Sequence, residues 1–201
     1  MVDLRGLNKL RIPDAYPMPL QQDVIESLRG MNYISCVDAS VFFYQFWLNP
    51  AHRERLTIIS HRGQEIPNVL LMGYGGSPQY TQRFMDKKLR EFKRFCKCFV
   101  DDVVIFSKTW EEHLLHLRTI FNLFLELRIW LAAPKSYLAY PSVELLGHHV
   151  NGFGMATSKA RVQAIKELLF PATLQKLETF IRMTRWLRQF VPFYTKVIEP
   201  L

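Results

Sequence analysis

Three carboxylates occur where the surrounding residues predict buried strands. Asp101 and Asp102 interrupt the otherwise apolar run 97–107, and Asp38 ends the strand-like run 33–38. An ionised group is rarely buried without a partner, because burial removes its hydration. The run 97–107 contains no Lys or Arg after its first residue. The compensating positive charge should therefore come from elsewhere in the chain or from a metal ion.

If the two predicted strands lie side by side, the three carboxylates converge into one acidic site. Such a site suits Mg²⁺, which binds one or two carboxylates together with substrate phosphates. Two ions ~3.5–4 Å apart, bridged by Asp38 and Asp101, would activate a primer 3′-hydroxyl and stabilise a leaving pyrophosphate. Two other interpretations stay open. The Asp-Asp pair could mark a solvated surface turn, or it could form the tip of a β-hairpin that exposes both carboxylates to a cleft.

The composition indicates a globular domain with a polyanionic partner. The chain has 201 residues, of which 49% are hydrophobic, and 26 Lys and Arg against 18 Asp and Glu give a net charge of +8. This balance favours nucleic acid first and a membrane surface second. No apolar stretch approaches the ~18 residues of a spanning helix, so we expect a soluble, intracellular protein of unspecified compartment. Cys36, Cys96 and Cys98 have neither disulfide nor zinc spacing, which predicts reduced thiols.

The elements that would hold the carboxylates are a mixture of strands and helices. Residues 1–20 contain three prolines, which predict an extended segment. A capping box formed by Thr109 and Glu112 predicts the start of a long helix. Helices are predicted over 20–29, 78–95, 109–127, 158–169 and 173–191, strands over 33–38, 43–60 with a break at 49–50, 68–72 and 97–107, a turn over 61–64, and a loop followed by a hairpin over 132–150.

A glycine-rich loop lies between a predicted strand and a basic helix. Gly73, Gly75 and Gly76 lack a Cβ and would let the backbone approach a nucleotide or template closely. The helix that follows is rich in cations near its end, and both a solvated face and phosphate contact are open interpretations. These cations are Lys87, Lys88, Arg90, Lys93, Arg94 and Lys97. Together with the carboxylate strands, the loop indicates phosphoryl transfer on nucleic acid.

Two histidines lie on one side of the predicted helix 109–127. His113 and His116 are three residues apart, a spacing that places both on one helix face. The sequence offers no third ligand in view, so we expect surface histidines rather than metal ligands.

Short motifs in a fixed order cover essentially the whole chain. They are VDLRGLNK at 2–9, DAYP at 14–17, VD at 37–38 with FFYQ at 42–45, MGY at 72–74, SP at 77–78, FVDD at 99–102, LLGH at 145–148, and the ending from WLR at 186–188 to PL at 200–201. This series resembles the reverse transcriptase domain of gypsy-type long-terminal-repeat retrotransposons, in the form carried by fungal elements. A chance match would not keep so many motifs in one order.

The resemblance implies an α+β fold, a right-hand polymerase palm whose antiparallel sheet is backed by helices, with partial fingers and the start of a thumb. One reverse transcriptase domain would span 1–201. Within it, the resemblance places partial fingers at 1–30 and 45–72, palm at 31–44 and 73–142, a primer-grip-like hairpin at 143–157, and the start of the thumb at 158–201.

The resemblance also assigns catalytic roles. Asp38 takes the first metal-ligand position, and Asp101 with Asp102 take the Tyr-x-Asp-Asp hairpin, in which Phe99 replaces the tyrosine. These three carboxylates would be catalytic and would bind Mg²⁺ or Mn²⁺. Lys135 matches a lysine that protonates the leaving pyrophosphate, and the alternative interpretation is a plain surface lysine.

Substrate contacts follow from the same resemblance. Phe43 falls at an aromatic steric gate that stacks under the deoxyribose and excludes a 2′-hydroxyl. The alternative is that Phe43 fills core. Met72 and Gly73 fall at the turn that faces the dNTP, with Tyr74 beside it.

The implied activity is RNA-directed DNA polymerisation, in which a primer 3′-hydroxyl is extended with dNTPs on a template. Arg5 would contact the template, and Leu146 and Gly147 would belong to the primer grip. We expect a fragment of a longer Pol polyprotein that lacks the upstream fingers strands and any ribonuclease H or integrase region. Neither a membrane nor disulfides are expected, and the oligomeric state is not predicted. The alternative is an inactive retrotransposon relic that at most binds nucleic acid.

Three arginines depart from the pattern of related elements. Arg128, Arg182 and Arg185 stand where those elements usually carry glycine. If such a glycine ends a helix with positive φ, arginine costs about 1 kcal/mol there. Inside a packed helix, the bulk of the arginine side chain would be the larger cost.

Overall fold

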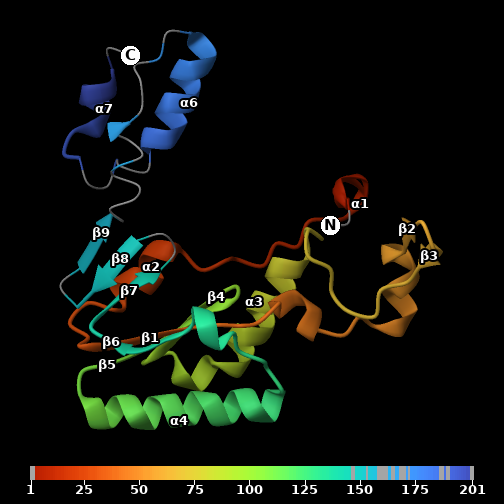
Figure 1. Cartoon of the computed structure of the whole chain (residues 1–201), viewed down its shortest axis with the longest axis horizontal. Helices are drawn as coiled ribbons and strands as arrows, with labels where there is room; N and C mark the ends of the chain where they lie inside the picture. Colours follow the sequence, from red (N-terminus) through yellow and green to blue (C-terminus); the bar gives the residue numbers. More distant parts are fainter. Residues whose placement is uncertain are drawn as a thin grey trace. The chain divides into compact units, whose positions relative to one another are not determined.

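The computed structural model describes residues 3–145, 148–152, 154–157, 163, 166–167, 171, 173–185, 188 and 191–199 of the chain. The chain forms two compact units, Met1–Ala156 and Thr157–Leu201. The first unit contains an antiparallel four-stranded sheet with helices on both faces, which confirms the expected α+β class (Figure 1). Every helix within the described ranges is too short or too polar to cross a lipid bilayer.

The central sheet brings distant segments of the chain together. Its strand order is β4 (Cys96–Phe99), β5 (Asp102–Ser107), β1 (Tyr33–Asp38) and β6 (Tyr137–Tyr140). Strand β1 pairs with β5 without a break, from Tyr33 opposite Ser107 to Asp38 opposite Asp102. Because this pairing is antiparallel, the end of β1 meets the beginning of β5.

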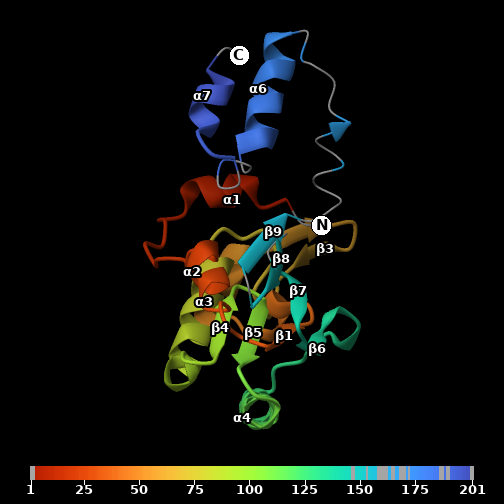
Figure 2. The same ribbon diagram turned by 90° about the vertical axis from the view of Figure 1, so that its left-hand side faces the viewer.

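The two faces of the sheet are both buried, which explains why β1 and β5 are continuously apolar in sequence. On one face, alternate residues Val37, Val103 and Ile105 pack against α3 (Ser77–Lys88) and α4 (Trp110–Leu127). On the other face, Cys36 and Val104 pack against α2 (Gln21–Glu26) and the hairpin of β7 (Ser142–Leu145) and β8 (His148–Asn151). Figure 2 shows the sheet between α4 on one side and α2 with β7–β8 on the other.

Helix α4 begins as its sequence predicts. The Thr109 side chain accepts a hydrogen bond from the Glu112 amide and the Glu112 side chain accepts one from the Thr109 amide, which confirms the capping box. The buried side chains of the helix include His113, Leu117 and Phe124. Full burial of an apolar side chain such as Phe124 stabilises the fold by about 1.5–3 kcal/mol.

Several predicted elements are wrong in the segment before the glycine-rich loop of Gly73, Gly75 and Gly76. Residues 5–10 form a helix, α1 (Arg5–Leu10), because the prolines that forbid helix occur only from Pro13 onward. The strand expected over 43–60 is mostly two short 3-10 helices, η1 (Phe42–Gln45) and η2 (Pro50–Leu56). Asn49 caps η2 by accepting from the Ala51 amide, so the Asn-Pro pair starts a helical turn instead of only breaking a strand.

The rest of that segment contains little strand. A short hairpin of β2 (Ile58–Ser60) and β3 (Gly63–Glu65) encloses the expected turn. The strand predicted over 68–72 is reduced to a single bridge between Trp47 and Val69.

The remaining differences lie further along the chain. Helix α3 ends at Lys88 and is followed by the 3-10 turn η3 (Arg90–Phe92), so the predicted helix 78–95 was too long. In place of the loop expected after 132, the 3-10 helix η4 (Ala133–Lys135) leads into β6. The hairpin β7–β8 was predicted, and β9 (Gly154–Thr157) extends it to three strands.

The second unit contains two described helices. Helix α6 (Leu174–Thr184) begins at Thr173, whose side chain accepts from the Lys176 amide, and α7 (Tyr194–Ile198) follows. The helix predicted over 173–191 therefore ends earlier than expected. The helix expected over 158–169 lies largely outside the described residues.

Candidate active site

Two of the predicted site carboxylates are direct neighbours across the sheet. Asp38 is the last residue of β1 and Asp102 the first of β5, and their Cα atoms are register partners. Paired residues of antiparallel strands project to the same face, with Cβ atoms about 4.5–5.5 Å apart. Both side chains are half-buried. The sheet therefore places two acidic side chains together at the end where β1 and β5 meet.

The third carboxylate lies at the turn between β4 and β5. Residues Val100 and Asp101 form the turn, Val100 has a left-handed backbone with φ of 57°, and the Asp101 side chain is exposed. The Asp101 carbonyl accepts a hydrogen bond of 3.1 Å from the Ala39 amide, which ties the turn to the end of β1. The continuous strand 97–107 is therefore wrong. The hairpin alternative is found, but its turn is formed by Val100 and Asp101, and Asp102 already belongs to β5.

The electrostatics show that these three carboxylates act on one another. Burial, then the charges of Asp101 and Asp38, raises the pKa of Asp102 to about 6, whereas Lys135 acts to lower that pKa. Burial and the same three carboxylates also raise the pKa of the neighbouring Cys36 thiol to about 12. A cluster of like charges that repel one another is a favourable place for a divalent cation.

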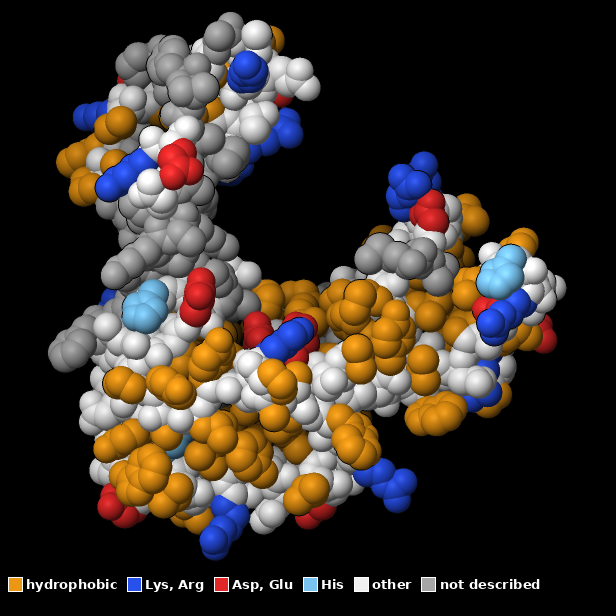
Figure 3. Space-filling model, viewed as in Figure 1, with side chains coloured by type: hydrophobic (Ala, Val, Ile, Leu, Met, Phe, Trp, Pro, Cys, Tyr) orange, Lys and Arg blue, Asp and Glu red, His pale blue; other side chains and the backbone are white. Residues whose placement is uncertain are grey.

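Lys135 reaches this cluster because η4 is hydrogen-bonded to the end of β1. The Ala132 amide donates to the Asp38 carbonyl at 2.8 Å, and the Asp38 amide donates to Ser136 Oγ at 3.3 Å. Lys135 itself is exposed, and its charge favours the ionised form of Asp102. In the space-filling view, acidic side chains lie beside a basic one on a face that is otherwise largely apolar or neutral (Figure 3).

The donor set fits a hard divalent cation that keeps part of its coordination for substrate. Within the described ranges, no three His, Cys, Asp or Glu side chains form a ready-made metal site. Mg²⁺ does not need one, since it is commonly held by one or two carboxylates plus substrate phosphates and water. The adjacent pair Asp38 and Asp102, with Asp101 on the turn beside them, supplies such ligands.

The aromatic pair after β1 divides into a core residue and a half-exposed residue. Phe42 is 3% exposed and belongs to the core against α3 and α4. Phe43 is half-buried, and its ring centroid lies 6.3 Å from that of Phe42. Phe42 therefore fills the core at this point, and part of the Phe43 ring is exposed to solvent.

The glycine-rich loop is held by α1. Gly73 has φ of 88°, a conformation that favours glycine, and nothing lies within 4 Å of the place where its Cβ would be. The Asn8 side chain donates to the Gly73 carbonyl at 2.9 Å and accepts from the Gly75 amide at 2.7 Å. Met72 is exposed and Tyr74 half-buried. The positioning role of Asn8 was not predicted.

The remaining predicted site residues are not brought to the carboxylates by any described contact. Arg5 is exposed on α1 and forms an ion pair of 2.7 Å with Asp3. Leu146 and Gly147 lie outside the described residues, between β7 and β8.

The two helix histidines are structural. His113 is fully buried, with one ring nitrogen 2.8 Å from Ser35 Oγ and the other 2.9 Å from Ser107 Oγ. His116 is half-buried and stacks on Phe95 at a centroid distance of 3.7 Å. The prediction of surface histidines is therefore wrong, because α4 turns this side toward the sheet.

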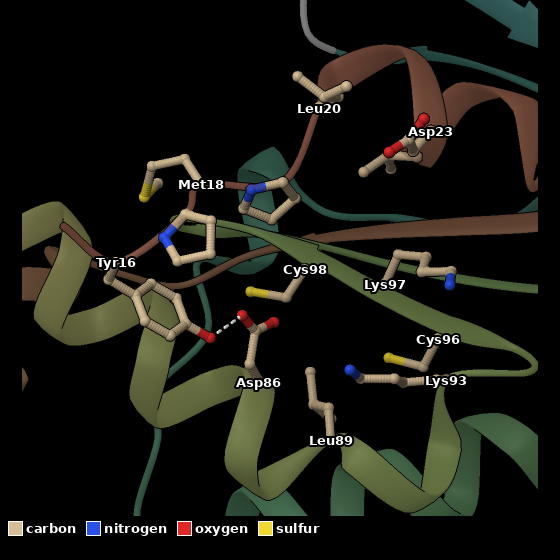
Figure 4. A pocket seen from close by; sticks show the side chains of 13 residues that line it. Tyr16, Met18, Leu20, Asp23, Asp86, Leu89, Lys93, Cys96, Lys97 and Cys98 are labelled. Carbon is tan, nitrogen blue, oxygen red and sulfur yellow. Dashed lines mark hydrogen bonds between the residues drawn. The ribbon is translucent and has the colours of Figure 1, made fainter.

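Sequence reasoning also missed a polar cluster behind the β4–β5 turn. Gln82 of α3 is fully buried and hydrogen-bonds to the backbone of Cys98 and Val100. Asp86, one turn later, accepts a hydrogen bond from Gln82. It also accepts one from the Tyr16 hydroxyl and lines a cavity of about 400 Å³, as Figure 4 shows. A pattern of apolar residues does not reveal such side chains, because their partners are backbone groups of another segment.

Comparisons with known proteins agree with this fold. The foamy viral protease-reverse transcriptase dRH in complex with double-stranded DNA superimposes with a TM-score of 0.92 at 23% identity, over 98% of this chain and 35% of that one. A second structure, the foamy viral protease-reverse transcriptase with an RNA/DNA hybrid, has a TM-score of 0.88, also at 23% identity, over 98% of this chain and 27% of that one. At this identity the likeness shows the fold, a reverse transcriptase palm.

Curated relatives agree with the predicted family. Over the whole chain, identity is 29% to the retrovirus-related Pol polyprotein from transposon opus and 27% to that from transposon gypsy, both of Drosophila melanogaster. It is 28% to the enzymatic polyprotein of Cauliflower mosaic virus, strain NY8153. The chain spans 20% of the two transposon polyproteins and 30% of the viral one. Residues 1–150 match the model of the reverse transcriptase (RNA-dependent DNA polymerase) family, and the chain belongs to this family.

Proposed function

We propose that this chain carries the nucleotidyl-transfer centre of an RNA-directed DNA polymerase. The observation that supports this most directly is the pairing of Asp38 with Asp102 at the sheet end, with Asp101 on the adjoining turn. The charge of +8 suits a nucleic-acid partner. The structural neighbours in complex with double-stranded DNA and with an RNA/DNA hybrid support the same class of partner.

The carboxylates would hold the metal ions. With a pKa of about 6, Asp102 is ionised at neutral pH and can act as a ligand together with Asp38 and Asp101. Bound Mg²⁺ would supply Lewis-acid activation of the primer 3′-hydroxyl and neutralise charge on the leaving pyrophosphate. Lys135, an exposed cation within the field of Asp102, would face the triphosphate and donate a proton to the pyrophosphate oxygen.

The other predicted residues would bind and select substrate. The half-exposed ring of Phe43 would pack under the deoxyribose and exclude a 2′-hydroxyl. The loop of Met72, Gly73 and Tyr74 would face the dNTP with little side-chain bulk at the glycine. Arg5 would contact the template, and the segment of Leu146 and Gly147 would contact the primer.

Primer extension on an RNA template tests the proposal. The 201-residue chain with Mg²⁺ or Mn²⁺ should extend a DNA primer, and Asp101→Asn should abolish extension while leaving template–primer binding within about twofold. Asp23→Asn, which removes an exposed carboxylate from α2, is the matched control and should extend normally. Salt-sensitive binding without extension by the unaltered chain would instead identify the inactive relic.

The Phe43 assignment has its own test. Phe43→Ala should admit ribonucleotides that the unaltered chain rejects, because the ring no longer occupies the space beside the sugar. If Phe43→Ala leaves ribonucleotide discrimination unchanged, Phe43 is not a gate.

A further inference from the structure

The Gln82 side chain hydrogen-bonds to the backbone of Cys98 and of Val100, the residues on either side of Phe99, just before the turn that carries Asp101. Its Nε2 donates to the Cys98 carbonyl at 3.0 Å, and its Oε1 accepts from the Val100 amide at 2.7 Å. Both partners belong to the end of the β4 segment that leads into Asp101. Glutamine suits this place because its side-chain amide is at once a donor and an acceptor.

The turn that Gln82 contacts needs such support. Val100 is β-branched and has φ of 57°, a conformation that branched residues rarely adopt. Strain of this kind costs about 1–3 kcal/mol and persists only where the surroundings enforce it. The Val100 amide is held by Gln82 on one side, and the Asp101 carbonyl is held by the Ala39 amide on the other. The turn is therefore fixed at two points.

Asp86 reinforces the orientation of the Gln82 amide that its backbone partners require. One carboxylate oxygen of Asp86 accepts from Gln82 Nε2 at 3.1 Å, and the other accepts from the Tyr16 hydroxyl (Figure 4). A carboxylate only accepts, so it must face the NH₂ group, which leaves the carbonyl oxygen for the Val100 amide. The hydrogen bond to Asp86 raises the pKa of Tyr16 to about 12.

Tyr16 is held against α3 by a second pair of contacts. Asp14 forms an ion pair with Arg83 at 2.6 Å, and the Arg83 guanidinium lies 4.8 Å from the centre of the Tyr16 ring. The extended segment before α2 is thus attached to the helix at the position of Asp86. A chain of contacts runs from this segment through Asp86 and Gln82 to the turn that bears Asp101.

We propose that Gln82 is a positioning residue for the catalytic turn and that Asp86 and Tyr16 hold its amide in the productive orientation. Gln82 is fully buried and hydrogen-bonds to Asp86 and to the backbone at the turn. It acts by keeping the Val100 amide and the Cys98 carbonyl in place, which sets the position of Asp101 relative to Asp38. The catalytic consequence rests on the proposed function, whereas the structural consequence does not.

The test measures the turn and the metal site separately. In Gln82→Met, the Val100 amide should exchange its hydrogen about tenfold faster, as measured by NMR. This factor corresponds to the stability lost with one buried hydrogen bond. Exchange of the Phe106 amide, which donates to the Phe95 carbonyl in the same sheet, should stay unchanged. Mn²⁺ titration by electron paramagnetic resonance should show severalfold weaker binding. Gln79→Met is the matched control, since Gln79 Oε1 has no hydrogen-bond partner to lose.

Tyr16→Phe provides the milder variant, because it removes one hydroxyl at the far end of the contact chain. It should accelerate Val100 exchange about two- to threefold and raise the Mn²⁺ concentration needed for half-maximal extension by a similar factor. Its result also decides the matter if Gln82→Met does not fold.

Three results would overturn the inference. They are unchanged Val100 exchange in the folded Gln82→Met variant, unchanged exchange in Tyr16→Phe, and an equal acceleration in Gln79→Met. An unaltered chain that extends no primer would refute the proposed function alone, because exchange and Mn²⁺ binding still report on the turn. Normal extension together with unaffected exchange in the variants would refute the positioning role alone.

Discussion

Arg128 ends α4 in a conformation that favours glycine. Its φ and ψ are 56° and 38°, its amide donates to the Leu125 carbonyl, and the Ile129 amide donates to the Phe124 carbonyl at 2.8 Å. These two hydrogen bonds define a Schellman motif, with Arg128 at the position where glycine is strongly preferred. The Arg128 side chain is exposed, so its removal leaves no cavity. Arg128→Gly should therefore stabilise the fold.

The size of the gain follows from opposing terms. A left-handed backbone costs an L-residue about 1–2 kcal/mol, which glycine avoids. Glycine has more conformational freedom in the unfolded chain, so ordering it on folding costs about 0.5–1 kcal/mol more than ordering alanine. Loss of a cation at a helix C-terminus removes a further ~0.3 kcal/mol or more. The net expectation is a gain of up to about 1 kcal/mol, or an increase of Tm by about 2–4 °C for a chain of this length.

Thermal and urea unfolding of three variants isolate the backbone contribution. Arg128→Ala removes the same charge but keeps the left-handed conformation, so Arg128→Gly should exceed it in stability by about 1 kcal/mol. Arg182→Gly should instead lower helix stability by about 1 kcal/mol, because Arg182 lies inside α6 with an 82% exposed side chain paired to Glu178. Equal stability of the Arg128→Gly and Arg128→Ala variants would refute the reasoning.

Three further predictions concern stability. Burial and neighbouring charge raise the pKa of Asp102 to about 6, so the folded state loses stability as the pH rises from about 4 to 6. In melting experiments above pH 6, Asp102→Asn should therefore have a higher Tm than the unaltered chain, and an equal Tm would contradict this. Burial lowers the pKa of His113 below its ordinary 6.5, so stability should fall as pH drops below 6.5, and His113→Gln should flatten that part of the profile. A Cβ on Gly152 would clash with the Met31 carbonyl oxygen, so Gly152→Ala should cost about 1–3 kcal/mol in urea unfolding. Gly6→Ala, where no atom lies within 4 Å, should cost nothing.

The sequence by itself determined the family, the acidic motif and the local features that depend on neighbours in the chain. The capping box at Thr109 and the hairpin around 145–148 follow from short-range hydrogen bonding and turn chemistry. The predicted helix 20–29 is α2, which ends already at Glu26, so Gly30 does not end it directly. The conformational cost at Arg128 was also foreseen, because it depends only on the way a helix ends.

Only the tertiary structure decided which residues meet. A run of apolar residues buried on both faces has the same pattern whether it forms one strand or two, so the apolar pattern of 97–107 left a continuous strand and a hairpin both open, and strand pairing placed the turn at Val100 and Asp101. The register that sets Asp102 opposite Asp38 is a property of strand pairing. Polar residues such as His113 and Gln82 are buried because packing supplies partners from distant segments, and those partners are not encoded within the helices that carry them.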